Sequence, residues 1–216
     1  MRPSLQALMK KIKGKTVFII GGGPSAQDVN FDLLQDELVI CINDAYRDFP
    51  NAAMIYWVDN NWVSENYDIL NSHKCKLRFT SKVAHHISYA KKPDPQTLCG
   101  GFVLKRTGDS GFDPAPDCLM GNNSGVQVLN LVVNMKPKNV ILIGYDMKRV
   151  GKKSHYHNQK RPYVGDNIYS GQFAPSLGAL AKGMKASGSR VNVINANPDS
   201  AVKCFNFGVY TDFLKH

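Results

Sequence analysis

Short apolar runs recur along the chain at strand length, and most of them are separated by segments that can form helices. The first run, Thr16–Ile20, has no polar side chain after Thr16, which is typical of a strand buried on both faces. Similar runs span residues 38–42, 54–58, 76–80, 140–143 and 191–194. This alternation predicts an α/β fold: a Rossmann-like, doubly wound and mostly parallel sheet flanked by helices.

The clearest helix begins after an Asn-rich turn at residues 121–124. Asn123 or Ser124 is its predicted N-cap, and Lys136-Pro137 ends the pattern. Its apolar positions fall at helical spacing, namely Val126, Leu129, Val132 and Val133. Asn30 is the predicted cap of a short helix that begins near Phe31.

No linker, repeat or low-complexity tract divides the 216 residues, so we expect a single transferase domain over residues 1–216. Between residues 84 and 117 the periodicity is weak and Pro and Gly are frequent, which indicates an insertion. This insertion is either a lid over the site or an irregular surface excursion, and the pattern favours neither.

The longest apolar runs are strand-sized, so the sequence predicts neither a transmembrane segment nor a secretory leader. A cytoplasmic location is therefore expected. The cysteines are odd in number and have no C-x-x-C spacing, which favours reduced thiols. They are Cys41, Cys75, Cys99, Cys118 and Cys204.

The net charge of +10, from 27 basic and 17 acidic residues, favours phosphorylated or polyanionic partners in general. Four lysines at residues 10–15 precede the first strand and are typical of the solvated face of a terminal helix. Six Lys or Arg residues at 148–161 follow a strand, where ligands of α/β sheets bind.

The first strand stops at a glycine-rich turn, Gly21-Gly22-Gly23-Pro24-Ser25. The glycines permit positive φ and leave no Cβ to keep a phosphate away from the backbone amides, and Ser25 adds a hydroxyl. The turn is not a dinucleotide fingerprint, because Ala26 replaces the third glycine, and no Gly-Lys-Ser/Thr follows to make a P-loop. We expect a ligand-binding loop; the alternative is a turn without a ligand.

Polar clusters follow four of the predicted strands, and the carboxyl ends of parallel strands converge on one edge of a sheet. The clusters are therefore expected to line one crevice. Asn side chains suit ribose hydroxyls and base edges because each both donates and accepts, although any single cluster can equally be a turn or cap. The clusters are Gly23-Pro24-Ser25, Asn43-Asp44, Asp59-Asn60-Asn61 and Gly144-Tyr145-Asp146.

Two further segments carry candidate chemistry. The helix start at residues 122–125 is the predicted phosphate site, because its unpaired amides and its dipole face the same crevice. In the segment 154–157, neighbouring positive charge favours a neutral His155 that can act as a general base. The alternatives are zinc binding by His155 and His157, or no chemical role for this loop.

Six short motifs, taken in order, resemble those of the bacterial CMP-sialic-acid-dependent sialyltransferases. They also resemble a wider group of phage-encoded and motility-accessory-factor proteins, which includes a 6-hydroxymethyl-dihydropterin diphosphokinase. The resemblance spans roughly residues 16–205, and each motif is two to four residues long. The motifs are Gly23-Pro24-Ser25, Cys41-Ile42-Asn43, Ser124-Gly125, Gly144-Tyr145-Asp146, Ser154-His155-Tyr156 and Asn197-Pro198-Asp199-Ser200.

The resemblance implies that the loop at residues 23–25 borders the nucleotide phosphate, that Asn43 and residues 123–125 hold the donor, and that His155 is the general base. The chain departs from the sialyltransferases after Asp146, where a tyrosine that steadies the departing phosphate is replaced by Met147 and Lys148. Lys148, Arg149 or Tyr156 is then expected to stabilise that phosphate.

The predicted catalytic residues are His155, Asp44 and Lys148, and no metal ligand is predicted. The predicted binding residues are Gly22, Gly23, Pro24, Ser25, Asn43, Asp59, Asn60, Asn122, Asn123, Ser124, Gly125, Asp146, Tyr156 and Ser200.

Together these features predict a nucleotide-sugar-dependent, sialyltransferase-like glycosyltransferase that needs no cofactor besides its donor. The expected acceptor is a hydroxyl, on a glycan or another polyanion, and an oligomer is compatible with the sequence. One alternative is a Mg²⁺-ATP-dependent diphosphokinase of the hydroxymethylpterin type, with Mg²⁺ held by Asp44, Asp59 and Asp146. Another is a nucleic-acid-binding accessory protein, although the chain has no recognised nucleic-acid-binding module.

Overall fold

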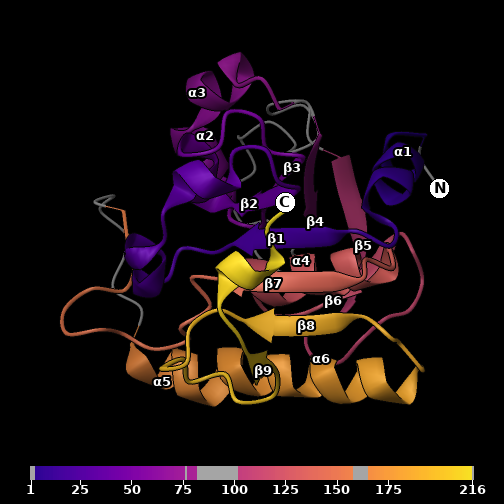
Figure 1. The fold of residues 1–216 in the computed structure, drawn as a ribbon, viewed down its shortest axis with the longest axis vertical. Coiled ribbons are helices and arrows are strands. Elements are labelled where there is room, and N and C mark those ends of the chain that lie inside the picture. Colours follow the sequence, from indigo (N-terminus) through magenta and orange to yellow (C-terminus); the bar gives the residue numbers. More distant parts are fainter. Residues whose placement is uncertain (1–2, 76, 82–101, 158–164, 216) are drawn as a thin grey trace.

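The computed structural model describes residues 3–75, 77–81, 102–157 and 165–215. Within them, nine parallel strands form one sheet in the order β6-β5-β4-β3-β2-β1-β7-β8-β9 (Figure 1). The strands are β1 Thr16–Ile20, β2 Val39–Ile42, β3 Met54–Trp57, β4 Arg78–Ser81, β5 Phe102–Gly108, β6 Cys118–Met120, β7 Asn139–Ile143, β8 Asn192–Asn195 and β9 Asn206–Phe207.

Helices cover both faces of this sheet, which confirms the predicted α/β, doubly wound, Rossmann-like architecture. Successive β1 residues alternate between two buried clusters: Val17 packs with α1, α4 and α6, whereas Phe18 packs with α2 and α3 on the other face. The α-helices are α1 Pro3–Ile12, α2 Asn60–Glu65, α3 Tyr67–Ser72, α4 Ser124–Asn134, α5 Asp166–Ile168 and α6 Ala174–Ala186. No helix in the described ranges has the length and apolarity needed to cross a membrane.

The strand order reverses between β1 and β7, because the chain builds outward from β1 to β6 and then returns beside β1 through α4. The loops that leave β1 and β7 therefore lie side by side at the carboxyl ends of these strands. In open α/β sheets this reversal is the point at which ligands bind.

Six strands match the apolar runs of the sequence, whereas β5, β6 and β9 were not predicted. Residues 102–108, expected to belong to an insertion, form β5 and pair with β4 in the sheet. The other residues of that segment before 102 lie outside the described part of the chain. The predicted caps are confirmed: Asn123 Oδ1 accepts from Val126 N at 3.1 Å, and Asn30 Oδ1 accepts from Asp32 N at 3.1 Å.

A buried polar cluster fastens α4 to the sheet. Gln127 Oε1 accepts hydrogen bonds from the hydroxyl of Tyr56 on β3 at 2.6 Å and that of Ser81 on β4 at 2.7 Å. Gln127 Nε2 donates to Gly121 O at 2.9 Å, in the turn before the helix. Because each group is buried, the cluster fixes the position of the start of α4 relative to the sheet.

Candidate functional site

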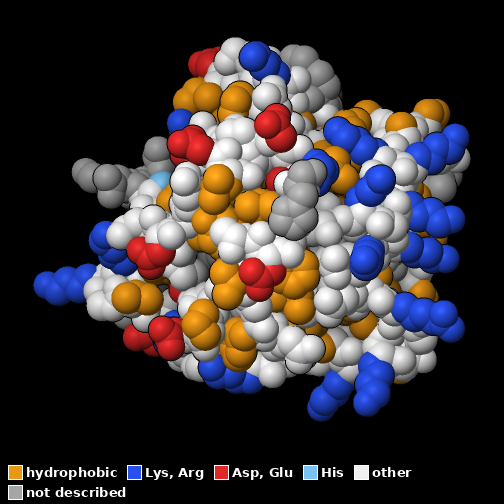
Figure 2. Space-filling view, in the orientation of Figure 1, with side chains coloured by type: hydrophobic (Ala, Val, Ile, Leu, Met, Phe, Trp, Pro, Cys, Tyr) orange, Lys and Arg blue, Asp and Glu red, His pale blue; other side chains and the backbone are white. Residues whose placement is uncertain are grey.

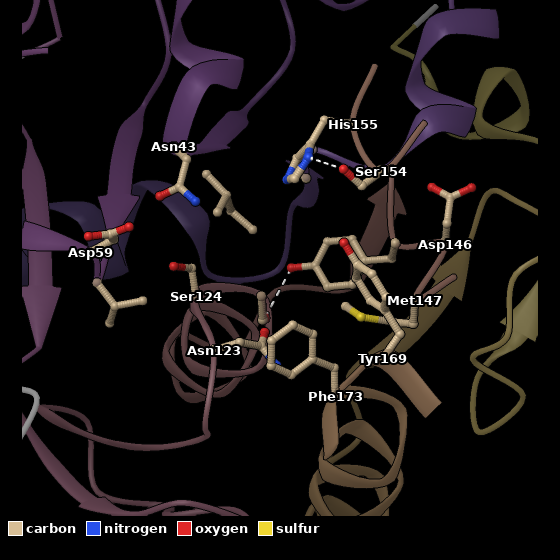
Figure 3. A pocket seen from close by; sticks show the side chains of 18 of the residues that line it. Asn43, Asp59, Asn123, Ser124, Asp146, Met147, Ser154, His155, Tyr169 and Phe173 are labelled. Carbon is tan, nitrogen blue, oxygen red and sulfur yellow. Dashed lines mark hydrogen bonds between the residues drawn. The ribbon is translucent and has the colours of Figure 1, made fainter. Parts of the chain in front are cut away.

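A pocket of about 500 Å³ opens at the carboxyl ends of β1, β2, β3 and β7, where the strand order reverses (Figure 3). The strand-end clusters predicted to converge do contribute to one lining. The predicted site residues in that lining are Gly22, Gly23, Asn43, Asp59, Asn122, Asn123, Ser124, Gly125, Asp146, Lys148 and His155.

The start of α4 forms the floor of the pocket. Asn123 Oδ1 caps the helix at Val126 N, while the amides of Ser124 and Gly125 have no hydrogen-bond acceptor among the residues described. The Tyr145 hydroxyl donates to Gly125 O at 3.1 Å and holds the first turn in place. Two unpaired amides at the positive end of an eleven-residue helix suit a phosphate or another anion.

One wall of the pocket is polar. The side chains of Asn43, Asp59 and Ser124 lie on the same side of the cavity in Figure 3. Asn43 adopts a left-handed φ of 50°, and its carboxamide Oδ1 is buried with no hydrogen-bond partner among the residues that the structure describes. Asp59 Oδ1 accepts from the Trp62 amide at 3.3 Å at the start of α2. A buried unpaired acceptor in a strained residue is unfavourable unless a ligand donates to it.

The opposite wall is apolar and was missed by sequence reasoning. Met147, Tyr169 and Phe173 lie together there (Figure 3), with the two rings 5.7 Å apart in an edge arrangement. Tyr169 and Phe173 bound a π-helical turn, a rare local structure that is frequent at functional sites. The available signal was an aromatic pair spaced i, i+4 just before the Pro175 helix start. Such a wall suits the face of a nucleobase.

A hydrogen bond joins this apolar wall to the α4 floor, because Asn122 Nδ2 donates to Gln172 O at 3.2 Å. Burial raises the pKa of Tyr169, and the nearby Arg149 and the Ser154 hydroxyl lower it in part. Tyr169 is therefore a neutral hydroxyl near pH 7 that can donate a hydrogen bond into the pocket.

The glycine-rich loop contacts the β7 loop more closely than the sequence suggested. The amides of Gly21 and Gly23 donate to Ile143 O at 2.8 Å and Gly144 O at 2.9 Å, and none of the three glycines has a positive φ. A Cβ on Gly23 would lie 2.0 Å from Asp146 Oδ2. The prediction that these glycine amides bind a phosphate is therefore corrected for Gly21 and Gly23, which instead let the two loops meet. Of the three glycines, only Gly22 has an amide without an acceptor among the described residues.

Asp146 lines the pocket, but its carboxylate is hydrogen-bonded to Ser25. The Asp146 carboxylate accepts from Ser25 Oγ at 2.9 Å, from Ser25 N at 3.2 Å and from Asn197 Nδ2 at 2.8 Å. Burial raises the pKa of Asp146, and these hydrogen bonds lower it in part. Ser200 is buried and donates to Tyr145 O at 2.6 Å. These predicted binding residues hold the loops after β1, β7 and β8 together.

His155 lies at the rim of the pocket, and its Nδ1 is 2.9 Å from Ser154 Oγ. When the serine oxygen accepts from Nδ1–H, Nε2 carries the lone pair and can accept a proton. A Cβ on Gly22 would lie 2.9 Å from His155 Cδ2, so a glycine is needed beside the ring. His157 is different: its Nε2 lies 3.8 Å from Asp44 Oδ2, and it does not line the pocket.

Six predicted site residues do not belong to the pocket lining: Ser25 and Ser200, described above, and Asp44, Tyr156, Pro24 and Asn60. Asp44 is buried, with Arg47 Nε 3.5 Å from its carboxylate. The Tyr156 hydroxyl donates to Asp48 Oδ2 at 2.6 Å, so it is not available to a departing phosphate. Pro24 is buried at the start of a short 3₁₀ helix, and the side chain of Asn60 lies outside the described part of the chain.

The three carboxylates considered for Mg²⁺ have separate partners. Asp44 contacts Arg47, Asp59 caps α2, and Asp146 binds the serine and asparagine of neighbouring loops. Across the described residues, no three or more His, Cys, Asp or Glu side chains gather as a metal site would require. Lys148 is exposed and is the only Lys or Arg among the described residues that line the pocket.

Neither a scan against models of known protein families nor a search of curated proteins finds a match to this chain.

Proposed function

We propose that the chain is a glycosyltransferase that binds a nucleotide-activated sugar in this pocket and transfers the sugar to a hydroxyl acceptor. The observation that carries the proposal is the meeting of three features in one cavity at the strand reversal. They are the unpaired amides of Ser124 and Gly125, the buried unpaired Oδ1 of Asn43, and the imidazole of His155. The sequence resemblance to the sialyltransferases points to the same reaction.

The lining suits the parts of a nucleotide in turn. The phosphate lies at the α4 amides, where the helix dipole favours negative charge. The base stacks against the wall of Tyr169 and Phe173, and Asn43 accepts a hydrogen bond from a ribose hydroxyl or an exocyclic amine. The sugar then extends toward His155 at the rim.

The reaction uses one proton transfer and one displacement. His155 Nε2 takes the proton of the acceptor hydroxyl while that oxygen attacks the anomeric carbon of the donor. The bond between the anomeric carbon and the phosphate oxygen breaks, and the nucleotide leaves with the electron pair. Lys148 and the α4 amides stabilise the negative charge on the departing phosphate.

A nucleotide-release assay with CMP-, UDP- and GDP-sugars tests the reaction. His155→Ala is expected to lower turnover by about 10²–10⁴-fold while leaving nucleotide affinity within about twofold. His157→Ala is the matched control, because it changes the same residue type in the same loop outside the pocket. In a pH profile, wild-type turnover is expected to fall at acidic pH, where the imidazole is protonated. This decrease should be absent from the pH profile of His155→Ala.

Two results would contradict the proposal. Full turnover in His155→Ala would exclude base catalysis by this loop. Alternatively, release of AMP from ATP with a hydroxymethylpterin acceptor, abolished by EDTA, would identify the Mg²⁺-dependent diphosphokinase instead.

A further inference from the structure

Positive charge gathers at the amino-terminal edge of the sheet, on the opposite side of the sheet from the pocket. Three loops, the third counted from the last turn of α6, enter adjacent strands there: residues 13–15 before β1, 136–138 before β7 and 185–190 before β8. Backbone hydrogen bonds fasten these loops to one another: Gly14 N donates to Lys136 O at 2.9 Å, Lys138 N to Lys15 O at 2.8 Å, and Asn192 N to Lys138 O at 3.1 Å.

Each loop contributes two exposed cations, and we call the set the basic edge: Lys13, Lys15, Lys136, Lys138, Lys185 and Arg190. The sequence around them contains no Asp or Glu over residues 1–27, 118–145 and 167–198. No member of the basic edge forms an ion pair with another described residue. Figure 2 shows Lys and Arg side chains gathered along the side of the molecule where α1 lies. The basic edge therefore carries six positive charges in stretches of sequence that have no acidic side chain.

The dimensions of the basic edge match a phosphate backbone. Three adjacent strands about 4.8 Å apart place the outer loops roughly 10 Å from each other. Successive phosphates on one strand of a duplex are about 3.4 Å apart along the helix axis, so roughly three phosphates face the row that the three loops form. Backbone hydrogen bonds hold the loops in this row before any partner binds, which lowers the entropic cost of binding.

An anionic membrane fits the basic edge less well. Membrane binding by charge alone is weak without an apolar anchor, and the large hydrophobic side chains exposed in the described residues lie on other segments. The apolar side of α1, with Leu5, Leu8 and Ile12, is buried in the core and cannot insert into lipid. The three loops also contain no aromatic residue, and single-strand binders use aromatic residues to stack bases.

We propose that the basic edge binds the phosphate backbone of double-stranded nucleic acid without reading its sequence. The contact involves only surface cations and phosphates, so it does not depend on the reaction in the pocket. Binding would hold the protein on a duplex with the pocket facing away from it.

Fluorescence anisotropy with a labelled 20-base-pair duplex, titrated with the whole chain, tests this proposal. If three phosphates are neutralised, log K falls against log salt with a slope of about −2.7, roughly a 40-fold loss between 50 and 200 mM. The triple variant Lys13→Glu, Lys138→Glu, Arg190→Glu changes one cation in each loop and is expected to weaken binding at least tenfold at 50 mM salt. The control Lys105→Glu, Lys152→Glu, Lys203→Glu makes the same change in net charge on exposed lysines elsewhere, and it should retain affinity within about threefold.

Circular dichroism and thermal melting of both triple variants establish that they fold. Three results would overturn the proposal: no binding of the duplex at 50 mM salt, an equal loss of affinity in the two triple variants, or tighter binding to vesicles of anionic phospholipid than to the duplex. A slope that flattens in the basic-edge variant and not in the control would support it.

Discussion

Replacing Asp146 tests whether this carboxylate positions loops or binds a ligand directly. Asp146→Leu keeps the branched shape of the side chain, although leucine is larger, and it leaves the Ser25 amide and Asn197 Nδ2 without their acceptor. A buried donor left unpaired costs about 1–3 kcal/mol, and both donors are only partly buried, so we expect a loss of about 2–4 kcal/mol. In a chain of this length that corresponds to a melting temperature lower by roughly 4–16 °C.

Asp146→Asn is the matched control. Its Oδ1 can still accept from Asn197 and from the Ser25 amide, while its amide group donates to Ser25 Oγ. We expect Asp146→Asn to change the free energy of unfolding by less than about 1 kcal/mol in urea denaturation. If Asp146→Asn and Asp146→Leu lose equal stability, or if Asp146→Leu loses none, the hypothesis that Asp146 positions the loops is wrong.

The comparison of the wild type with Asp146→Asn also predicts how stability depends on pH. Burial raises the pKa of Asp146 above its ordinary value of 3.8, so the folded state binds this proton more tightly than the unfolded state. The resulting stability is fully present below about pH 3.8 and is lost as the pH rises through the folded pKa. The stability of Asp146→Asn relative to the wild type should therefore increase with pH across that window. A difference that stays constant or falls with pH would contradict the cause assigned to the shift.

Two further predictions concern stability, each measured by urea denaturation. Gly23→Ala should lower the free energy of unfolding by at least about 2 kcal/mol, because the new Cβ would lie 2.0 Å from Asp146 Oδ2. The control is Gly178→Ala in α6, where a Cβ would have no atom within 4 Å. This variant should be neutral or stabilising by up to about 1 kcal/mol. Gln127→Leu should cost about 2–4 kcal/mol, because it leaves two buried hydroxyls on β3 and β4 unpaired; a loss below 0.5 kcal/mol would show that water replaces the amide.

Local sequence signals predicted six of the strands and helix α4. Apolar runs located six strands, and the Asn123 cap located α4, because both depend on residues adjacent in sequence. The convergence of polar strand ends followed from the geometry of parallel sheets, so Asn43, Asp59 and the start of α4 were identified as parts of one pocket.

Non-local contacts account for what could not be predicted. Ser25 and Asp146 are 121 residues apart, and no local pattern indicates that each is the other's partner. In β5, Lys105, Arg106 and Thr107 break the apolar pattern, and pairing with β4 and β6 makes the segment a strand. The aromatic wall depends on how the π-helical turn at residues 169–173 meets the β7 loop.

The most direct test of the central claim is calorimetric titration of CMP, UDP, GDP and ATP, with and without Mg²⁺, into the wild type and Asn43→Gly. Glycine tolerates the φ of 50° at this position, so the variant should unfold within about 1 kcal/mol of the wild type. The account predicts that at least one nucleotide binds the wild type and that Asn43→Gly weakens it by about 1–3 kcal/mol, roughly 5–150-fold. No binding by any of the four, or equal affinity in a folded Asn43→Gly, would contradict it.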